Sequence, residues 1–167
     1  MEKNKTWENL NDVEKQNYIE FHTAYYQDDI LHAEFVAIKH PRWSIISGYY
    51  AMHDITKLLL AKQFGIKITS PQIHAKTIVA IEHFVRDIEL KSKLLPLLKE
   101  AKQTFYEAER LKEKIIPLLL KQSKKQREAS QYYSEDYSNK KSVNVKKSIE
   151  FLEQVVRPYI KIIKGLL

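Results

Sequence analysis

The sequence predicts an all-α protein, an antiparallel bundle of five or six helices with no sheet. Glycine occurs only 3 times and proline 5 times in 167 residues, which is too few for the corners of an all-β chain. Residues that favour helix, chiefly Lys, Glu, Leu, Ile and Ala, dominate the composition, and apolar residues recur at spacings of three and four. The length fits one helical domain over residues 1–167 that buries a core of useful size.

The first two predicted helices are bounded by capping residues. The first helix is expected to begin with Asn11 or Asp12 as its N-cap and to end before His40–Pro41, because the residue before a proline avoids the α region. The second helix is expected over Ser47–Gly65, where apolar residues form adjacent stripes at helical spacing. Gly65 should end this helix as a C′ glycine.

The third and fourth predicted helices follow after a short connection. The third is expected to open with Ser70 as its cap and Pro71 at its first position, and to end near Asp87. A long helical region then runs over Ser92–Tyr133, with an apolar stripe along one face. Pro117 should break or kink it.

The last predicted helix follows the polar loop Ser134–Lys141. It is expected to begin near Ser142 and to be kinked at Pro158. Because most of the expected connections are short, consecutive helices should lie antiparallel, as in a bundle.

The net charge of +7 is unevenly distributed along the chain. Residues 1–90 carry 10 Lys and Arg against 12 Asp and Glu, a balance of −2, whereas residues 91–167 carry 18 against 9, a balance of +9. The densest basic stretch, Lys121–Lys147, also contains three tyrosines, and this mixture suits phosphate contact and base stacking. A solvated, lysine-rich surface is the plainer interpretation of the same charge.

The composition also indicates a compartment. Cysteine is absent, which excludes disulfides, thiolate metal sites and cysteine nucleophiles and fits a reducing environment. The polar N-terminal segment lacks the apolar core of a signal peptide, and apolar runs such as Ile115–Leu120 are too short to span a bilayer. We therefore expect a soluble, cytoplasmic protein without membrane contact.

Common metal and cofactor patterns are missing from the sequence. No Glu has a His three residues later, no two of the six histidines are four residues apart, and no glycine-rich phosphate loop is present. We therefore predict no metal and no cofactor.

The dipeptide His53–Asp54 is the one pattern that resembles a catalytic class. Helical metal-dependent phosphohydrolases of the HD type carry an adjacent His and Asp on a helix, and they also need an earlier His and a later Asp. In this chain, His22 or His32 would have to be the earlier histidine, and Asp87 the later aspartate. The plainer interpretation makes His53 a hydrogen-bonded core residue at the edge of the apolar stripe, with Asp54 outside.

The stretch SGYYAMHDITKLLLAKQFG, Ser47–Gly65, resembles the second helix of HEPN domains (higher eukaryotes and prokaryotes nucleotide-binding). Those domains carry a pattern like R-A-Y-Y-A-M-F-H-A-A-K-A-L-L followed by a glycine. Its tyrosines Tyr49 and Tyr50 are expected to pack and hydrogen-bond within the bundle. The stretch ITSPQIHAKTIVAIEHF is similar to the third HEPN helix, T-H-K-G-V-I-x-x-F, with His74 and Lys76 near the histidine and lysine of the family.

Two further motifs follow in the family's order. REASQYYSEDY, Arg127–Tyr137, is similar to R-x-x-A-D-Y-x-x-x-Y, and Ser148–Ile163 is similar to the closing helix A-x-x-F-L-x-x-V. The resemblance covers about residues 28–165. The segment Glu89–Lys125 is longer than the usual connection, so an extended helical hairpin is expected there.

The resemblance implies a small helical bundle that often dimerises, with members encoded beside or fused to minimal nucleotidyltransferases. Several members are toxins or RNases with an R-x(4–6)-H motif, in which arginine holds the phosphate and histidine performs acid–base chemistry. Arg127 takes the arginine position here, but Tyr132 and Tyr133 stand fifth and sixth after it, and no histidine follows His83. Tyrosine is protonated at pH 7 and is a poor base, so a non-catalytic version is favoured.

The predicted site surrounds the arginine of the third motif, and no catalytic residue is assigned to it. Its members are Arg127, Lys124, Lys125, Tyr132, Tyr133 and Lys76. The predicted function is a homodimeric, non-catalytic HEPN-type module that binds a nucleotide, RNA or a nucleotidyltransferase partner in a toxin–antitoxin-like or stress system. Two alternatives stay open: an HEPN ribonuclease whose acid–base residue comes from elsewhere, such as His74 or His83, and an HD-type phosphohydrolase.

Overall fold

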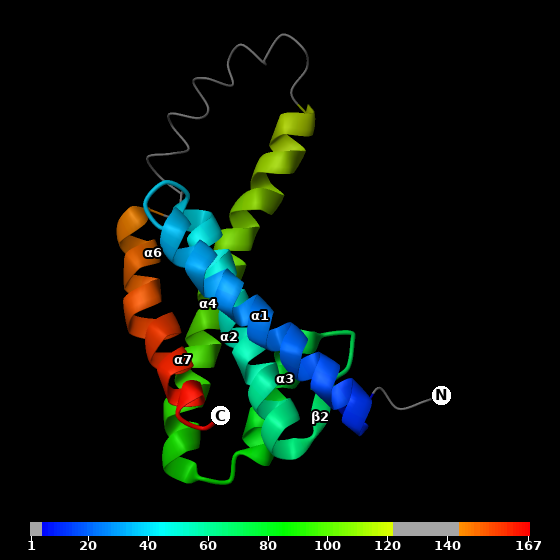
Figure 1. Cartoon of the computed structure of the whole chain (residues 1–167). Coiled ribbons are helices and arrows are strands. Elements are labelled where there is room, and N and C mark those ends of the chain that lie inside the picture. The colour runs from blue at the N-terminus through cyan, green and yellow to red at the C-terminus, as the bar shows by residue number, and fades with distance from the viewer. Residues whose placement is uncertain (1–4, 122–143) are drawn as a thin grey trace.

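The computed structural model describes residues 5–121 and 144–167, and the side chains of residues 5–110 and 144–167. The elements in chain order are β1 (Trp7–Asn9), α1 (Asp12–Val36), α2 (Pro41–Phe64), β2 (Ile66–Ile68), α3 (Ile73–Phe84), α4 (Ile88–Lys121), α6 (Val145–Phe151), the π-helical η2 (Leu152–Val156) and α7 (Arg157–Lys164). Since α6, η2 and α7 follow one another without a break, the described part is a bundle of five helices, as predicted (Figure 1). None of the described helices is long and apolar enough to cross a bilayer.

Helix α2 lies at the centre of the bundle. Sixteen of its 24 residues are buried, more than a single apolar stripe would place against one neighbour. Helix α1 packs along one side of α2, and α3, α4 and the C-terminal helix cover other sides (Figure 1). A functional group on α2 can therefore reach solvent only between neighbouring helices.

Two predicted helix boundaries are confirmed. Asn11 is the N-cap of α1: its side chain accepts from the Glu14 N–H at 2.9 Å, and the Glu14 carboxylate accepts from the Asn11 N–H at 3.4 Å. This arrangement is a capping box. Gly65 ends α2 in the left-handed conformation, with φ of 65°. Helix α2 begins earlier than Ser47, at Pro41, because a proline at the first position loses no helical hydrogen bond.

The predicted start of the third helix is wrong. Ser70 is not its cap and Pro71 is not its first residue, because α3 begins at Ile73. The preceding Gln72 has φ of 64°, so the chain passes through a left-handed residue before the helix starts. The helix therefore begins without a serine cap and without a proline at its first position.

Helix α4 starts before the predicted Ser92. Asp87 does not belong to the end of α3; its carboxylate accepts from the Leu90 N–H at 2.9 Å and caps α4 instead. The helix continues unbroken past Pro117 to its end at Lys121. The rest of the predicted long helix, the predicted loop and any second arm of a hairpin fall in residues 122–143, outside the described part.

The prediction that the chain has no sheet is wrong. Strands β1 and β2 pair antiparallel, with Trp7 opposite Ile68 and Asn9 opposite Ile66. The exposed fractions of Ile66 and Ile68 are 2% and 9%, so alternate side chains of β2 point into the core. Strands of three residues are too short for their alternation to be recognised in a sequence.

The helix contains a π turn just before Pro158, where a kink is predicted. The N–H of Arg157 bonds to the carbonyl of Leu152, five residues back, immediately before the proline. Proline removes a donor and crowds the preceding turn, and the wider π turn accommodates both effects. This segment packs against Gly48 of α2, where a Cβ atom would lie 3.0 Å from Cγ2 of Val156.

Candidate functional site

Most of the predicted site lies outside the described residues. This applies to Arg127, Lys124, Lys125, Tyr132 and Tyr133. Lys76 is described, and its ammonium donates to the Lys5 carbonyl at 2.9 Å and to the Thr69 hydroxyl at 3.1 Å. These bonds connect the chain before β1 with the chain after β2, so Lys76 stabilises the end of the small sheet.

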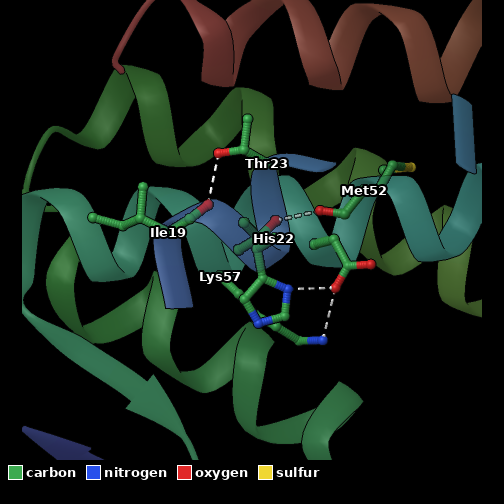
Figure 2. A network of polar contacts seen from close by, with 7 residues as sticks. Ile19, His22, Thr23, Met52 and Lys57 are labelled. Carbon is green, nitrogen blue, oxygen red and sulfur yellow. Dashed lines mark hydrogen bonds and ion pairs between the residues drawn. The ribbon is translucent and has the colours of Figure 1, made fainter. Parts of the chain in front are cut away.

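Asp54 of the His53–Asp54 dipeptide is the centre of a buried ionic network. It is 6% exposed, and its Oδ1 lies 2.9 Å from Nδ1 of His22 and 3.0 Å from Nζ of Lys57 (Figure 2). The expectation that Asp54 lies outside the bundle is therefore wrong. The carboxylate is shared between α1 and α2 and fixes the two helices to each other.

The protonation of this network follows from two opposing effects. Burial raises the pKa of Asp54, but the hydrogen bond from His22 and the charge of Lys57 outweigh it and bring the pKa below its ordinary value. Burial also acts on Asp29 of α1, where the charges of Asp54 and Asp28 add to it and raise the pKa to about 6. Asp54 is therefore ionised at neutral pH and serves as a fixed anchor.

The ligand set of an HD-type metal site is not assembled by these residues. Nδ1 of His32 lies 2.7 Å from the hydroxyl of Ser47, Asp87 caps α4, and Asp54 is bound to Lys57. Within the described residues no group of three or more His, Asp or Glu side chains is placed to hold a metal ion. The phosphohydrolase alternative therefore has no geometric support in this part of the chain.

A cluster of rings lies where α2, α3 and α4 meet. The ring of Tyr49 is nearly parallel to those of His74 and Phe105, with centroids 5.1 and 4.3 Å away. The ring of His53 is edge-on to Tyr49 and to His74, at 4.5 Å from each. We call Tyr49, His53, His74 and Phe105 the ring cluster.

The ring cluster contains polar atoms that no described group satisfies. The Tyr49 hydroxyl, both ring nitrogens of His53 and Nδ1 of His74 are buried and make no hydrogen bond to the described residues. The predictions that Tyr49 and His53 are hydrogen-bonded are therefore wrong for these atoms, although both residues are core residues at 0% and 1% exposure. Unsatisfied buried polar groups are costly and uncommon, so their gathering marks the cluster as a candidate site.

Both histidines of the ring cluster are neutral at pH 7. Burial lowers the pKa of His53 well below its ordinary value, and His74, Lys57 and Lys102 act in the same direction. Burial, with Lys57 and Lys102, also lowers the pKa of His74. A neutral imidazole offers one N–H donor and one lone pair. Burial raises the pKa of Tyr49, which therefore retains its proton.

A surface hollow of about 380 Å³, which we call the α3–α4 groove, is lined by residues of α3 and α4 that include the sequence neighbours of His74 and Phe105. The residues that line it are Ala75, Ile78, Lys99, Lys102, Gln103 and Tyr106. Nζ of Lys102 lies 6.0 Å from the ring centre of Tyr106, which is 44% exposed. Tyr50, at 40% exposure, has its ring 6.0 Å from that of His74.

The groove combines a cation with exposed aromatic faces. Lys99 is paired with Glu82 at 3.4 Å, whereas Lys102 makes no ion pair to a described residue. An ammonium attracts phosphate, and an exposed tyrosine ring offers a surface on which a base can stack. His74 precedes the lining residue Ala75, and the charge of Lys102 helps to lower its pKa, so a neutral imidazole lies near the groove.

The groove is not indicated by the distribution of charge along the sequence, because the highest density of basic residues lies at Lys121–Lys147. The available signal was Lys102 and Tyr106, four residues apart on a predicted helix and therefore on one face. Nothing in the linear sequence indicates that His74 and Tyr50 lie beside this face, because they belong to other helices.

Comparisons with protein-family models, with curated proteins and with solved structures find no match to this chain. The resemblance to HEPN domains therefore stays a prediction from the quoted motifs.

Proposed function

We propose that the chain is a non-catalytic HEPN-type module that binds a nucleotide or single-stranded RNA in the α3–α4 groove. The observation that carries this proposal is the position of Lys102 beside the exposed ring of Tyr106. The bundle architecture agrees with what the HEPN resemblance implies, and the four motifs occur in the family's order.

Charge and polarity support a phosphorylated aromatic ligand. Residues 91–167 carry 18 Lys and Arg against 9 Asp and Glu, so polyanions are attracted to this half of the chain. Within it, Lys102 supplies a positive charge for a phosphate, Tyr106 supplies a stacking surface, and His74 supplies a donor or acceptor for the edge of a base. A simple anion would use only the first of these groups.

Binding of fluorescently labelled single-stranded RNA, and of ATP, to purified variants tests the proposal. We expect Lys102→Ala and Tyr106→Ala each to weaken binding about tenfold, since one stacked base contributes about 1–3 kcal/mol. Tyr106→Phe keeps the ring and should retain most of the affinity. Lys93→Ala, at an exposed lysine of the same helix, serves as the matched control. Unchanged affinity in Lys102→Ala and Tyr106→Ala would disprove binding in the groove.

The predicted site around Arg127 is tested in the same assay, by the binding of RNA and of ATP to separate variants. We propose that Arg127, Lys124 and Lys125 extend the contact along a longer RNA, which would make their substitution matter for RNA and not for ATP. Equal RNA affinities of the wild type, Arg127→Ala and Tyr133→Ala would remove this extension and leave the groove untouched.

A minimal nucleotidyltransferase is the protein partner that we propose, in a toxin–antitoxin-like or stress system. The support is the HEPN resemblance alone. Co-expression with a nucleotidyltransferase encoded beside this chain, followed by size-exclusion chromatography, tests it. Separate elution of the two proteins would count against the partnership, and so would the absence of such a gene.

A metal-independent ribonuclease is the second candidate, favoured by the neutral imidazole of His74 near Lys102. A neutral imidazole accepts a proton, and a nearby ammonium stabilises the charge that develops on a phosphate. His83, the other predicted acid–base residue, instead packs against Trp7 with ring centroids 4.9 Å apart. Cleavage of mixed RNAs in the presence of a chelator that is lost in His74→Ala would establish this function, and intact RNA would exclude it.

A further inference from the structure

Helix α1 exposes large apolar side chains on the face opposite the bundle. Phe35 is 86% exposed, Ile38 is 70%, Leu31 is 64%, Tyr25 is 51% and Phe21 is 49%. With side-chain areas of about 150–250 Å², these fractions correspond to an apolar surface on the order of 600 Å². The largest apolar patch of a typical monomer is about 300–600 Å² and is often functional, so this face is suited to burial in an interface.

The exposed residues follow a seven-residue repeat along α1. Positions three and four residues apart form a line of exposed side chains, which we call the α1 seam: Phe21, Ala24, Asp28, Leu31, Phe35 and Ile38. The helical path extends through Ile38, because Ala37 is in the α conformation and the His40 N–H bonds to the Val36 carbonyl at 2.7 Å. A repeat of this kind is the geometry with which two helices pack along their length.

We propose that the α1 seam binds the α1 seam of a second copy of the chain, antiparallel, in a two-fold symmetric dimer. A two-fold axis places the same surface on both subunits, so the seam must be complementary to itself. A standard interface buries roughly 800 Å² on each partner. The large side chains of the seam, together with Tyr25 stacked on Phe21, supply on the order of 600 Å², and flanking residues complete the area.

One antiparallel register makes the seam self-complementary. When the axis passes between residues 29 and 30, Phe35 lies opposite Ala24 of the partner, so the largest side chain meets the smallest. Phe21 then lies opposite Ile38, and Asp28 opposite Leu31, which offsets the two Asp28 residues by three positions, about 4.5 Å, along the helix axis. Alternation of large and small side chains is what permits close packing between two helices.

The same register also pairs opposite charges at the edge of the seam. Glu20 lies opposite Lys39 of the partner, and symmetry repeats the pair. Both residues are exposed, and neither forms an ion pair with a described residue. The unpartnered face, its area and this charge complementarity all favour a second copy of the chain as the occupant.

This dimer is independent of the nucleotide proposal. The seam consists of exposed residues of α1, opposite the buried residues with which α1 packs on the bundle, whereas the groove is formed by α3 and α4. Loss of RNA binding would therefore leave the dimer in place, and loss of the dimer would leave the groove intact.

Sedimentation equilibrium of the full chain is the first test. We expect a dimer in the wild type, and an increase of at least a hundredfold in the dissociation constant of Phe35→Glu, since two central anchors are lost and two charges are buried. Phe35 is exposed in the subunit, so this variant should fold, as circular dichroism would verify. Ile88→Glu, at an 82% exposed apolar residue of α4, is the matched control. A monomeric wild type, or a Phe35→Glu variant that still forms a dimer, would overturn the proposal. The seam would then be assigned to contact with another protein.

Crosslinking tests the register, because the natural chain contains no cysteine. In the proposed dimer, Glu20→Cys and Lys39→Cys lie opposite each other, while each lies about 28 Å from its own copy at 1.5 Å per residue. Under mild oxidation neither variant alone should form a linked dimer, and their mixture should. Linked dimers of a single variant would indicate parallel helices, and no linkage in the mixture would exclude the register; either result overturns the proposal.

Discussion

The adjacent residues His53 and Asp54 are both buried, but only Asp54 has polar partners. Consecutive side chains on a helix point about 100° apart, so Asp54 faces His22 on α1 while His53 faces His74 on α3. The sequence specifies that the two residues are neighbours, but the packing of the other helices decides what each one contacts. An adjacent His–Asp pair is therefore weak evidence for a shared site.

We predict that Asp54→Asn destabilises the fold by about 3 kcal/mol, the scale for breaking a buried ion pair. The substitution removes the counter-charge of Lys57, whose side chain is only 17% exposed, and weakens the bond to His22. Urea denaturation at pH 7 measures the effect. The matched control is Glu89→Gln, which removes an exposed pair with Lys93 and should cost less than about 1 kcal/mol. Equal costs would show that burial of the network contributes little.

We predict that His53 makes the protein less stable as the pH falls from 7 to 5. Its folded pKa is lowered, so below about pH 6.5 the unfolded chain takes up a proton that the folded chain does not, and stability decreases. His74 acts in the same sense. Asp29 opposes them, because its pKa of about 6 means that the folded state takes up a proton first.

Substitution of His53 by Leu isolates its contribution to this pH dependence. We expect His53→Leu to be at least as stable as the wild type at pH 7, since it removes two unsatisfied polar atoms. Between pH 6 and pH 5 the stability of the wild type should decrease more steeply, by up to about 1.4 kcal/mol per pH unit for one proton. Urea denaturation at pH 7, 6 and 5 measures both. Parallel pH profiles of the two proteins would contradict the assignment.

At the scale of the elements, boundaries set by local chemistry were predictable and those set by tertiary contacts were not. Asn11 and Gly65 act through bonds within a few residues and were identified from sequence. The pairing of β1 with β2 depends on segments that meet only in the folded chain, and nothing in the sequence around Gln72 indicates its left-handed conformation. The last helix begins at Val145, close to the predicted Ser142, because Asn144 accepts from the Lys147 N–H at 2.8 Å and caps it.

We predict that Gly48 is required for the contact between α2 and the π-helical segment. A Cβ atom there would lie 3.0 Å from Val156 and 3.3 Å from Phe151. Overpacking costs about 1–3 kcal/mol and should outweigh the helix propensity gained from alanine, about 1 kcal/mol. Gly48→Ala should therefore be destabilising, and the cost should shrink in the background Val156→Ala, where the obstructing methyl group is gone. Thermal denaturation of the four proteins of this cycle measures the coupling; additive effects would contradict the contact.

At the scale of the whole molecule, the class of fold was predictable because composition and periodicity act over the entire chain. Few glycines, many helix-favouring residues and repeated apolar spacing all agree with the observed bundle. The candidate site was not predictable, since Tyr50, His74 and Lys102 come from three helices and have no common motif. Of the predicted site residues, only Lys76 is described, and it stabilises the small sheet.

The two proposed ways in which this molecule binds RNA differ in their dependence on salt. Electrostatic attraction arises from the basic half of the chain and should weaken steeply between about 50 mM and 200 mM salt, whereas stacking on Tyr106 is far less sensitive to salt. Substitution of Lys124 and Lys125 by Ala should flatten the salt dependence, by about 0.7 in the logarithmic slope for each lysine that contacts a phosphate. Tyr106→Ala should lower the affinity by a similar factor at every salt concentration and leave the slope unchanged. RNA titrations at four salt concentrations decide this. If Tyr106→Ala changed the slope, or the lysine substitutions did not, then the groove and the basic segment would not have the separate roles assigned to them.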